Sequence, residues 1–105
     1  MRSLTDAERD LVKLLLISAG DQRPIAGLVE EMADGQMGSL RFAGPAGRRY
    51  GGIVAQAEFR DADETLVYAA LLLDEVGALF ELDVWKVDFS PLMKIPPVEQ
   101  IAVAP

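Results

Sequence analysis

Apolar residues near the start of the chain recur with a helical period. From Ala7 to Leu16 they lie three or four positions apart, and charged residues occupy the other side of the same segment. Thr5 precedes this segment and Glu8 follows three residues later, which is the spacing of a capping box. Gly20 is suited to end a helix. The pattern therefore predicts an N-terminal helix that begins after Thr5 and ends before Gly20.

The next segment is compatible with two structures. Pro24 favours the start of a new helix, and the apolar residues between positions 25 and 32 have the spacing to line one. Residues 29–33 would also serve as a strand that leads into the turn formed by Asp34 and Gly35. We favour the short second helix.

Beyond that turn the apolar period changes from 3.6 to 2. Residues 40–42 and 53–60 alternate apolar and polar side chains, as half-buried strands do. Residues 65–73 are apolar on both faces, and residues 78–88 alternate again. Helix followed by strands predicts a single α+β domain over residues 1–105. We expect an N-terminal helix or helices packed on an antiparallel β-meander sheet of four to five strands.

The strand at residues 65–73 has a consequence for assembly. Helices can cover only one face of a sheet, so the second apolar face needs another cover. Either the tail at residues 96–105 runs over it as an extended strap, or a second subunit does. We expect a homodimer.

The last predicted strand has two different faces. One set of alternate residues is apolar and is assigned to the core: Phe80, Leu82 and Val84. The other set is acidic and aromatic and faces away: Glu81, Asp83, Trp85 and Val87. Trp85 would either close the edge of the core or anchor an interface, because tryptophan combines a large apolar area with one donor. Both interpretations remain open at this point.

Charge is distributed unevenly along the chain, whose net charge is −7. Residues 1–57 are neutral, whereas residues 58–88 hold only Arg60 and Lys86 against nine acids. These acids are Glu58, Asp61, Asp63, Glu64, Asp74, Glu75, Glu81, Asp83 and Asp88. Such a field repels nucleic acid and steers a basic partner towards the sheet. Alternatively, the acids serve only to keep a two-faced apolar sheet soluble.

Composition excludes several kinds of chemistry. The chain has no cysteine and no histidine, so thiolate chemistry, disulfides, histidine bases and histidine-bound zinc are impossible. We therefore expect no enzyme activity, no catalytic residues, no cofactor and no metal. The apolar run at residues 14–19 is far shorter than the ~20 residues that span a bilayer, and the polar N-terminus is unlike a signal peptide. We expect a cytoplasmic protein that binds neither membranes nor nucleic acid.

Two short motifs are weak candidates for ligand sites. Asp61, Asp63 and Glu64 resemble the start of a calcium loop, but Leu66 and Leu72 stand where an EF-hand needs glycine and glutamate. An ordinary turn is the better interpretation. The loop from Gly44 to Gly52 has the glycines and arginines of a phosphate site but lacks the lysine-serine ending of a P-loop. It fits a basic hairpin loop better.

Two blocks carry a resemblance to a known family. The sequences DGQMGSL (residues 34–40) and ELDVWKVDFSPL (residues 81–92) resemble the DG-x-MGSL and ELD-x-WK-x-DFSPL blocks of a family of small uncharacterised bacterial proteins that carry a domain of unknown function. The likeness spans nearly the whole chain and implies no activity. It marks, without roles, Asp34, Gly35, Met37, Gly38, Ser39, Trp85, Lys86, Asp88, Phe89, Ser90 and Pro91. More loosely, the size and acidity are similar to those of toxin-immunity proteins.

These observations lead to a functional hypothesis. We expect a non-enzymatic module of the immunity or antitoxin type, whose acidic sheet face binds a basic protein such as a toxin domain. The partner-binding candidates are Glu81, Asp83, Trp85, Asp61, Asp63 and Glu64. One alternative is a small-ligand or hydrolytic site between the Gly44–Gly52 loop and the turn at residues 34–39. Another is a structural subunit of a larger assembly.

Overall fold

One helix and six antiparallel strands make up the regular structure of the computed structural model, which describes residues 1–25 and 27–105. The elements, in chain order, are α1 (Asp6–Ser18), β1 (Val29–Glu31), β2 (Leu40–Phe42), β3 (Tyr50–Arg60), β4 (Leu66–Asp74), β5 (Leu79–Lys86), the 3₁₀ turn η1 (Val98–Gln100) and β6 (Ala102–Val103). Within the described residues, no helix is both long enough and apolar enough to cross a bilayer. The α+β class expected from the sequence is confirmed.

Helix α1 forms where the sequence pattern predicts it. The Thr5 hydroxyl accepts a hydrogen bond from the backbone N–H of Glu8, and the Glu8 carboxylate accepts one from the backbone N–H of Thr5. This is the predicted capping box, which satisfies backbone donors that the first helical turn leaves without partners. At the other end Gly20 adopts a left-handed conformation (φ 71°), and the helix ends at Ser18.

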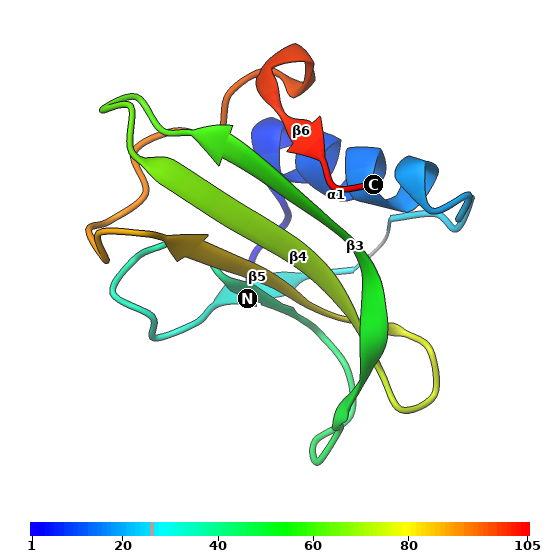
Figure 1. Cartoon of the computed structure of the whole chain (residues 1–105). Coiled ribbons are helices and arrows are strands. Elements are labelled where there is room, and N and C mark those ends of the chain that lie inside the picture. The colour runs from blue at the N-terminus through cyan, green and yellow to red at the C-terminus, as the bar shows by residue number, and fades with distance from the viewer. Residues whose placement is uncertain (26) are drawn as a thin grey trace.

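The strands form a single sheet in the order β1-β2-β5-β4-β3-β6 (Figure 1). Strands β3, β4 and β5 follow one another as the predicted meander. Strand β2 lies beside β5 rather than beside β3, so the four central strands have the arrangement of a Greek key. The expectation of four to five strands was too low because β1 and β6, of three and two residues, give almost no periodic signal.

The predicted second helix is wrong. Residues 29–31 form β1 instead, paired with β2 and extended by a bridge to Arg2. The backbone of Val29 exchanges two hydrogen bonds with that of Arg2, at 2.7 and 2.8 Å. These sheet bonds satisfy backbone groups, many of which a helix this short would leave without partners. Residue 26 of the predicted helix lies outside the described residues.

The C-terminal tail does not run across the second face of the sheet as a strap. After η1 it forms β6, which extends the edge of the sheet by pairing Val103 with Ala57 and Ala102 with Glu58. A further backbone bond joins the N–H of Ala104 to the carbonyl of Gln56 at 2.8 Å. The tail therefore protects part of the β3 edge, and the second face keeps exposed side chains.

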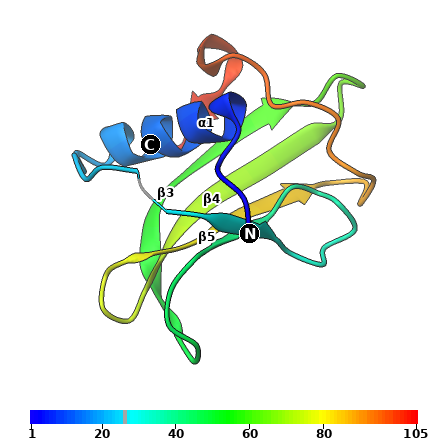
Figure 2. The same cartoon turned by 180° about the vertical axis from the view of Figure 1, so that it is seen from behind.

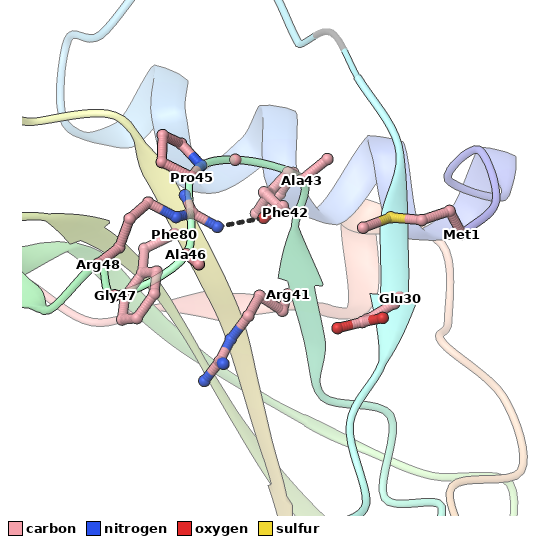
Figure 3. Close-up of a pocket in the computed structure, with 11 residues that line it drawn as sticks. Met1, Glu30, Arg41, Phe42, Ala43, Pro45, Ala46, Gly47, Arg48 and Phe80 are labelled. Carbon is pink, nitrogen blue, oxygen red and sulfur yellow. Dashed lines mark hydrogen bonds between the residues drawn. The ribbon is translucent and has the colours of Figure 1, made fainter.

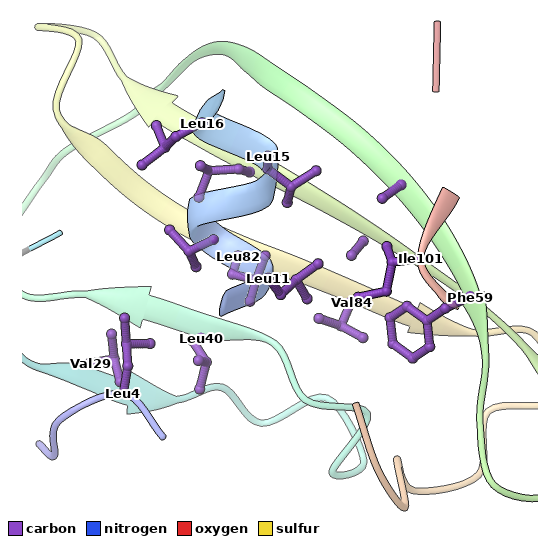
Figure 4. Packing of buried hydrophobic residues seen from close by; sticks show 14 of the residues in the cluster. Leu4, Leu11, Leu15, Leu16, Val29, Leu40, Phe59, Leu82, Val84 and Ile101 are labelled. Carbon is purple, nitrogen blue, oxygen red and sulfur yellow. The ribbon is translucent and has the colours of Figure 1, made fainter. Parts of the chain in front are cut away.

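The hydrophobic core lies between α1 and one face of the sheet. Helix α1 packs across β3 and β4 (Figure 2) and buries Leu11, Val12, Leu15 and Leu16. Figure 4 shows Leu11, Leu15 and Leu16 of the helix close to Leu82 and Val84, with Leu40 and Val29 extending the core to β1. Leu82 and Val84 thus point inward as predicted. Phe80 is also buried, but its ring lies outside this cluster, between the guanidinium groups of Arg41 and Arg48.

Candidate functional site

The side of the sheet opposite α1 presents residues that alternate with the core residues of β3, β4 and β5; we call this side the open face. The strand register sets them in rows: Glu58, Tyr68 and Trp85 in one, and Gln56, Ala70 and Asp83 in the next. A third row joins Leu72, Glu81 and Arg41. The open face therefore brings three of the predicted contact residues together: Glu81, Asp83 and Trp85.

Three aromatic residues meet on the open face; we call them the aromatic cluster. The rings of Trp85 and Tyr68 are stacked, with centroids 5.7 Å apart and an interplanar angle of 26°. Phe89 lies on Trp85 with a centroid distance of 6.2 Å and a tilt of 48°. The exposed fractions are 42% for Tyr68, 47% for Trp85 and 68% for Phe89. Trp85 is therefore a surface residue and does not close the core.

Phe89 reaches this position through an unfavourable backbone conformation. Its φ is 61°, in the left-handed region that bulky L-residues rarely adopt and that costs about 1–2 kcal/mol. Its N–H closes a turn onto the carbonyl of Lys86 at 2.9 Å. A glycine would make this turn without strain. The sequence instead places an aromatic ring there, two-thirds exposed, beside Trp85.

More than half of the acids in residues 58–88 are paired with cations within the fold. Five of the nine acids form ion pairs: Asp61 and Asp63 with Lys86, Asp74 with Arg48, Glu75 with Arg49, and Glu81 with Arg41. Three of these cations come from positions 41–49, in the part of the chain that is neutral by itself. Counting charge by segment missed this compensation because β2 and the loop after it pack beside β4 and β5.

The remaining four acids have no ion pair among the described residues: Glu58, Glu64, Asp83 and Asp88. Three of them surround the aromatic cluster. Glu58 shares a row with Tyr68, Asp83 precedes Trp85 by two residues on the same face, and Asp88 precedes Phe89. Three of the four acids without ion pairs are thus neighbours of the exposed aromatic side chains.

Asp83 has the least favourable environment of these acids. Partial burial raises the pKa of its carboxyl group above the usual range, and the charges of Glu81 and Asp34 raise it further. Its neighbour across the sheet, Ala70, has no donor to offer. A cation placed at Asp83 would relieve this repulsion.

Asp61 and Asp63, two of the predicted partner-binding residues, pair with Lys86 within the fold. Lys86 is completely buried, and its ammonium group donates to Asp61 at 2.8 Å, to Asp63 at 2.9 Å and to the carbonyl of Pro91 at 3.2 Å. Asp61, 3% exposed, also accepts hydrogen bonds from three backbone N–H groups, those of Ala62, Met93 and Lys94. We call this group the Lys86 cluster. It fastens the segment after β5 to the turn after β3.

The pKa values in the Lys86 cluster follow from these contacts. Burial acts to raise the pKa of Asp61, but the bonds from Lys86 and from the backbone N–H groups outweigh it and hold that pKa below the usual range. The bond to Asp61 raises the pKa of Lys86 despite its burial. Both groups are therefore charged at neutral pH, and Asp61 is not accessible to a partner. Glu64 remains exposed in the same turn.

The two blocks that carry the family resemblance lie against each other. The hydroxyl of Ser39 donates to the carbonyl of Val84 at 3.1 Å and accepts from its N–H at 2.9 Å. The N–H of Leu92 donates to the carbonyl of Gln36 at 2.9 Å. Gly38 has a φ of 105°, which L-residues rarely adopt, and a methyl group there would lie 2.8 Å from the Cδ2 of Leu92. The turn at residues 34–39 therefore supports the end of β5 from the side.

A pocket of about 210 Å³ lies at the Gly44–Gly52 loop (Figure 3). Loop residues line one side of it, and Met1 and Glu30 line the other. Arg48 is largely buried there and donates to the carbonyls of Phe42 and Leu79, so its donors hold the loop closed. The turn at residues 34–39 precedes β2 whereas the loop follows it, and the turn does not line the pocket. The predicted site between them is not formed as one cavity.

Contacts within the chain engage the polar groups of both short motifs. No group of three or more potential metal-ligating side chains occurs in the part of the chain that the structure describes. The carboxylates of Asp61 and Asp63, the start of the possible calcium loop, are occupied by Lys86. The pocket at the Gly44–Gly52 loop is smaller than the roughly 300–1,000 Å³ that is typical of ligand pockets.

The residues that sequence reasoning missed are Tyr68, Phe89 and Lys86. Lys86 has the same parity in β5 as Leu82 and Val84, and that spacing was the signal for its inward orientation. Comparison with curated proteins gives no match, and comparison with solved structures gives none either. Residues 1–96 match the model of a domain of unknown function, DUF6984, and the chain belongs to that family.

Proposed function

We propose that this protein is a non-enzymatic binding module of the immunity or antitoxin type, and that its open face binds a basic protein. The observation that carries this proposal is the aromatic cluster, exposed on a sheet face and surrounded by carboxylates without ion pairs. Tryptophan and tyrosine are enriched at the centres of protein interfaces, where their large apolar area is buried on binding. Carboxylates around such a centre favour a partner of opposite charge.

The strain at Phe89 supports the same proposal. A conformation that costs about 1–2 kcal/mol persists only when the surrounding structure imposes it, and such residues cluster at functional sites. Packing of the core does not require the Phe89 ring, which is 68% exposed. A contact between the Phe89 ring and a binding partner would explain why the strained conformation is kept.

The alternatives receive less support. The pocket at the Gly44–Gly52 loop is small, and its buried arginine is engaged with backbone carbonyls of the same chain. Without histidine and cysteine, a hydrolytic site would have to rely on carboxylates, lysine, tyrosine or arginine. The buried carboxylates are already paired with Lys86, Arg48 or Arg41. A structural subunit of an assembly would use the open face in the same way as a binding module, with a permanent partner.

The proposal is tested by affinity capture from the native cell with three immobilised proteins. These are the parent, Trp85→Ala, and Val76→Ala as a control, because Val76 is 81% exposed in the turn between β4 and β5. We expect the parent and the control to retain the same basic protein, identified by mass spectrometry. Trp85→Ala should lose it, with a cost in binding of about 2 kcal/mol or more.

Salt provides an independent readout in the same experiment. Exposed charges are screened over about 8–10 Å near physiological ionic strength, so association with a basic partner should slow as salt is raised. A partner that Trp85→Ala retains as well as the parent, with salt-independent kinetics, would refute the use of the open face.

A further inference from the structure

We infer that the open face accepts an arginine side chain of its partner, with the guanidinium group stacked on Trp85 and paired with Asp83. This inference rests on the proposed function and specifies the chemistry of its central contact. It concerns two residues on the same strand and the same face, separated by Val84, which points into the core.

Asp83 is a carboxylate without a cation. It forms no ion pair among the described residues, whereas Glu81, the next acid on the same face, is bound by Arg41. Asp34 adds a further negative charge nearby. A cation brought by a partner would therefore meet an uncompensated site at Asp83, and would gain little at Glu81.

The site formed by Trp85 and Asp83 favours arginine over lysine. Alternate residues of a strand are about 7 Å apart, so one side chain can reach both the Trp85 ring and the Asp83 carboxylate. A guanidinium group is planar, stacks on aromatic faces and donates two parallel hydrogen bonds to a carboxylate. The ammonium group of lysine is compact and strongly hydrated, and it gains less from a half-exposed ring.

A second copy of the chain is a less favourable occupant of the open face than a basic partner. Two open faces brought together would oppose the unpaired carboxylates Glu58 and Asp83 of one copy to those of the other. Each copy also carries a net charge of −7. Like charges placed across an interface suppress association, so a basic partner fits this face better than a second copy does.

The chain contains one tryptophan, so its fluorescence reports directly on Trp85. The probes are three acetylated, amidated pentapeptides with the sequence Gly-X-Gly-X-Gly, in which X is arginine, lysine or citrulline. Citrulline keeps the shape of arginine without its charge. We expect a saturable change in fluorescence with the arginine peptide, binding at least about fivefold weaker for the lysine peptide, and no change with the citrulline peptide.

Two protein variants with the same change in charge complete the test. Asp83→Asn should weaken binding of the arginine peptide about fivefold, which corresponds to a partly exposed ion pair. Glu99→Gln should leave it unchanged, because Glu99 lies in η1, which packs on α1 away from the open face. Thermal melts establish that both variants are folded.

The peptide experiments test the arginine inference, and the capture experiment tests the proposed function. Equal binding of the arginine and lysine peptides, equal weakening by both variants, or no binding of any peptide would overturn the arginine inference. None of these results affects the capture of a basic partner through Trp85, which tests the proposed function separately. Conversely, capture that survives Trp85→Ala would refute the proposed function even if the peptides bind.

Discussion

Replacing Asp61 by asparagine removes the charge at the centre of the Lys86 cluster with almost no change in shape. Each carboxylate oxygen of Asp61 accepts two hydrogen bonds: Oδ2 from Lys86 and Met93, and Oδ1 from Ala62 and Lys94. An amide nitrogen cannot accept, so either orientation of the asparagine leaves two donors without their acceptor.

The cost follows from these contacts. A buried donor left without an acceptor costs about 1–3 kcal/mol, and removing one partner of a buried ion pair costs about 3–5 kcal/mol. We therefore expect Asp61→Asn to lower the free energy of unfolding by about 3–5 kcal/mol. Asp63→Asn is the matched control: it contacts the same ammonium group, but its side chain is 37% exposed, and we expect a cost of at most about 1 kcal/mol.

Urea unfolding at pH 7, followed by circular dichroism, measures both variants. The difference in free energy of unfolding between the parent and Asp61→Asn should also depend on pH. Because the pKa of Asp61 is lower in the folded protein than in the unfolded chain, its contribution is complete above the unfolded pKa, near 4, and is lost as pH falls through the folded pKa. The gap should therefore narrow below about pH 4. Equal costs for Asp61→Asn and Asp63→Asn would refute the assignment of Asp61 as the buried centre.

Three further predictions use the strand register and the backbone. Leu82→Ala should destabilise by about 2–5 kcal/mol and Asp83→Ala by less than about 1 kcal/mol in urea, and equal effects would mean that the register of β5 is wrong. Gly51→Ala should lower the free energy of unfolding by about 1–3 kcal/mol, because the added methyl group would overlap the carbonyl oxygen of Asp74; an unchanged melting temperature would contradict this packing. Phe89→Asn should be at least as stable as the parent, since asparagine tolerates a left-handed backbone, while partner capture is reduced; a clear loss of stability would instead assign the ring a structural role.

The parts of the fold that the sequence predicted are those with local signals. The capping box at Thr5 and Glu8 specifies the start of α1, period-2 alternation specifies β3 and β5, and a continuous apolar run between turns specifies β4. Strand β1 was misassigned because its three residues allow either interpretation, and only pairing with β2 and Arg2 decides between them. Short edge elements depend on partners distant in sequence, which a single sequence does not specify.

The candidate site was also predicted only in part, because the sequence carries local signals but does not specify contacts between distant segments. Alternation in β5 correctly placed Asp83 and Trp85 together on the face away from the core. The roles of Asp61 and Lys86 could not be predicted because their contact joins the turn after β3 to the end of β5. Phe89 was missed because its exposure depends on a backbone conformation that a phenylalanine rarely adopts.

The Lys86 cluster has a consequence for the lifetime of the folded state. It joins residues as far apart as Asp61 and Lys94, and it can form only after β4 and β5 have paired and the segment that follows them has returned to the turn. We therefore expect its contacts to be absent from the transition state for folding. Interactions of this kind slow unfolding and have little effect on the rate of folding. The buried ion pair therefore acts mainly on the unfolding rate, that is, on how long each native molecule persists before it unfolds. Resistance to proteolysis depends on this rate when cleavage is faster than refolding.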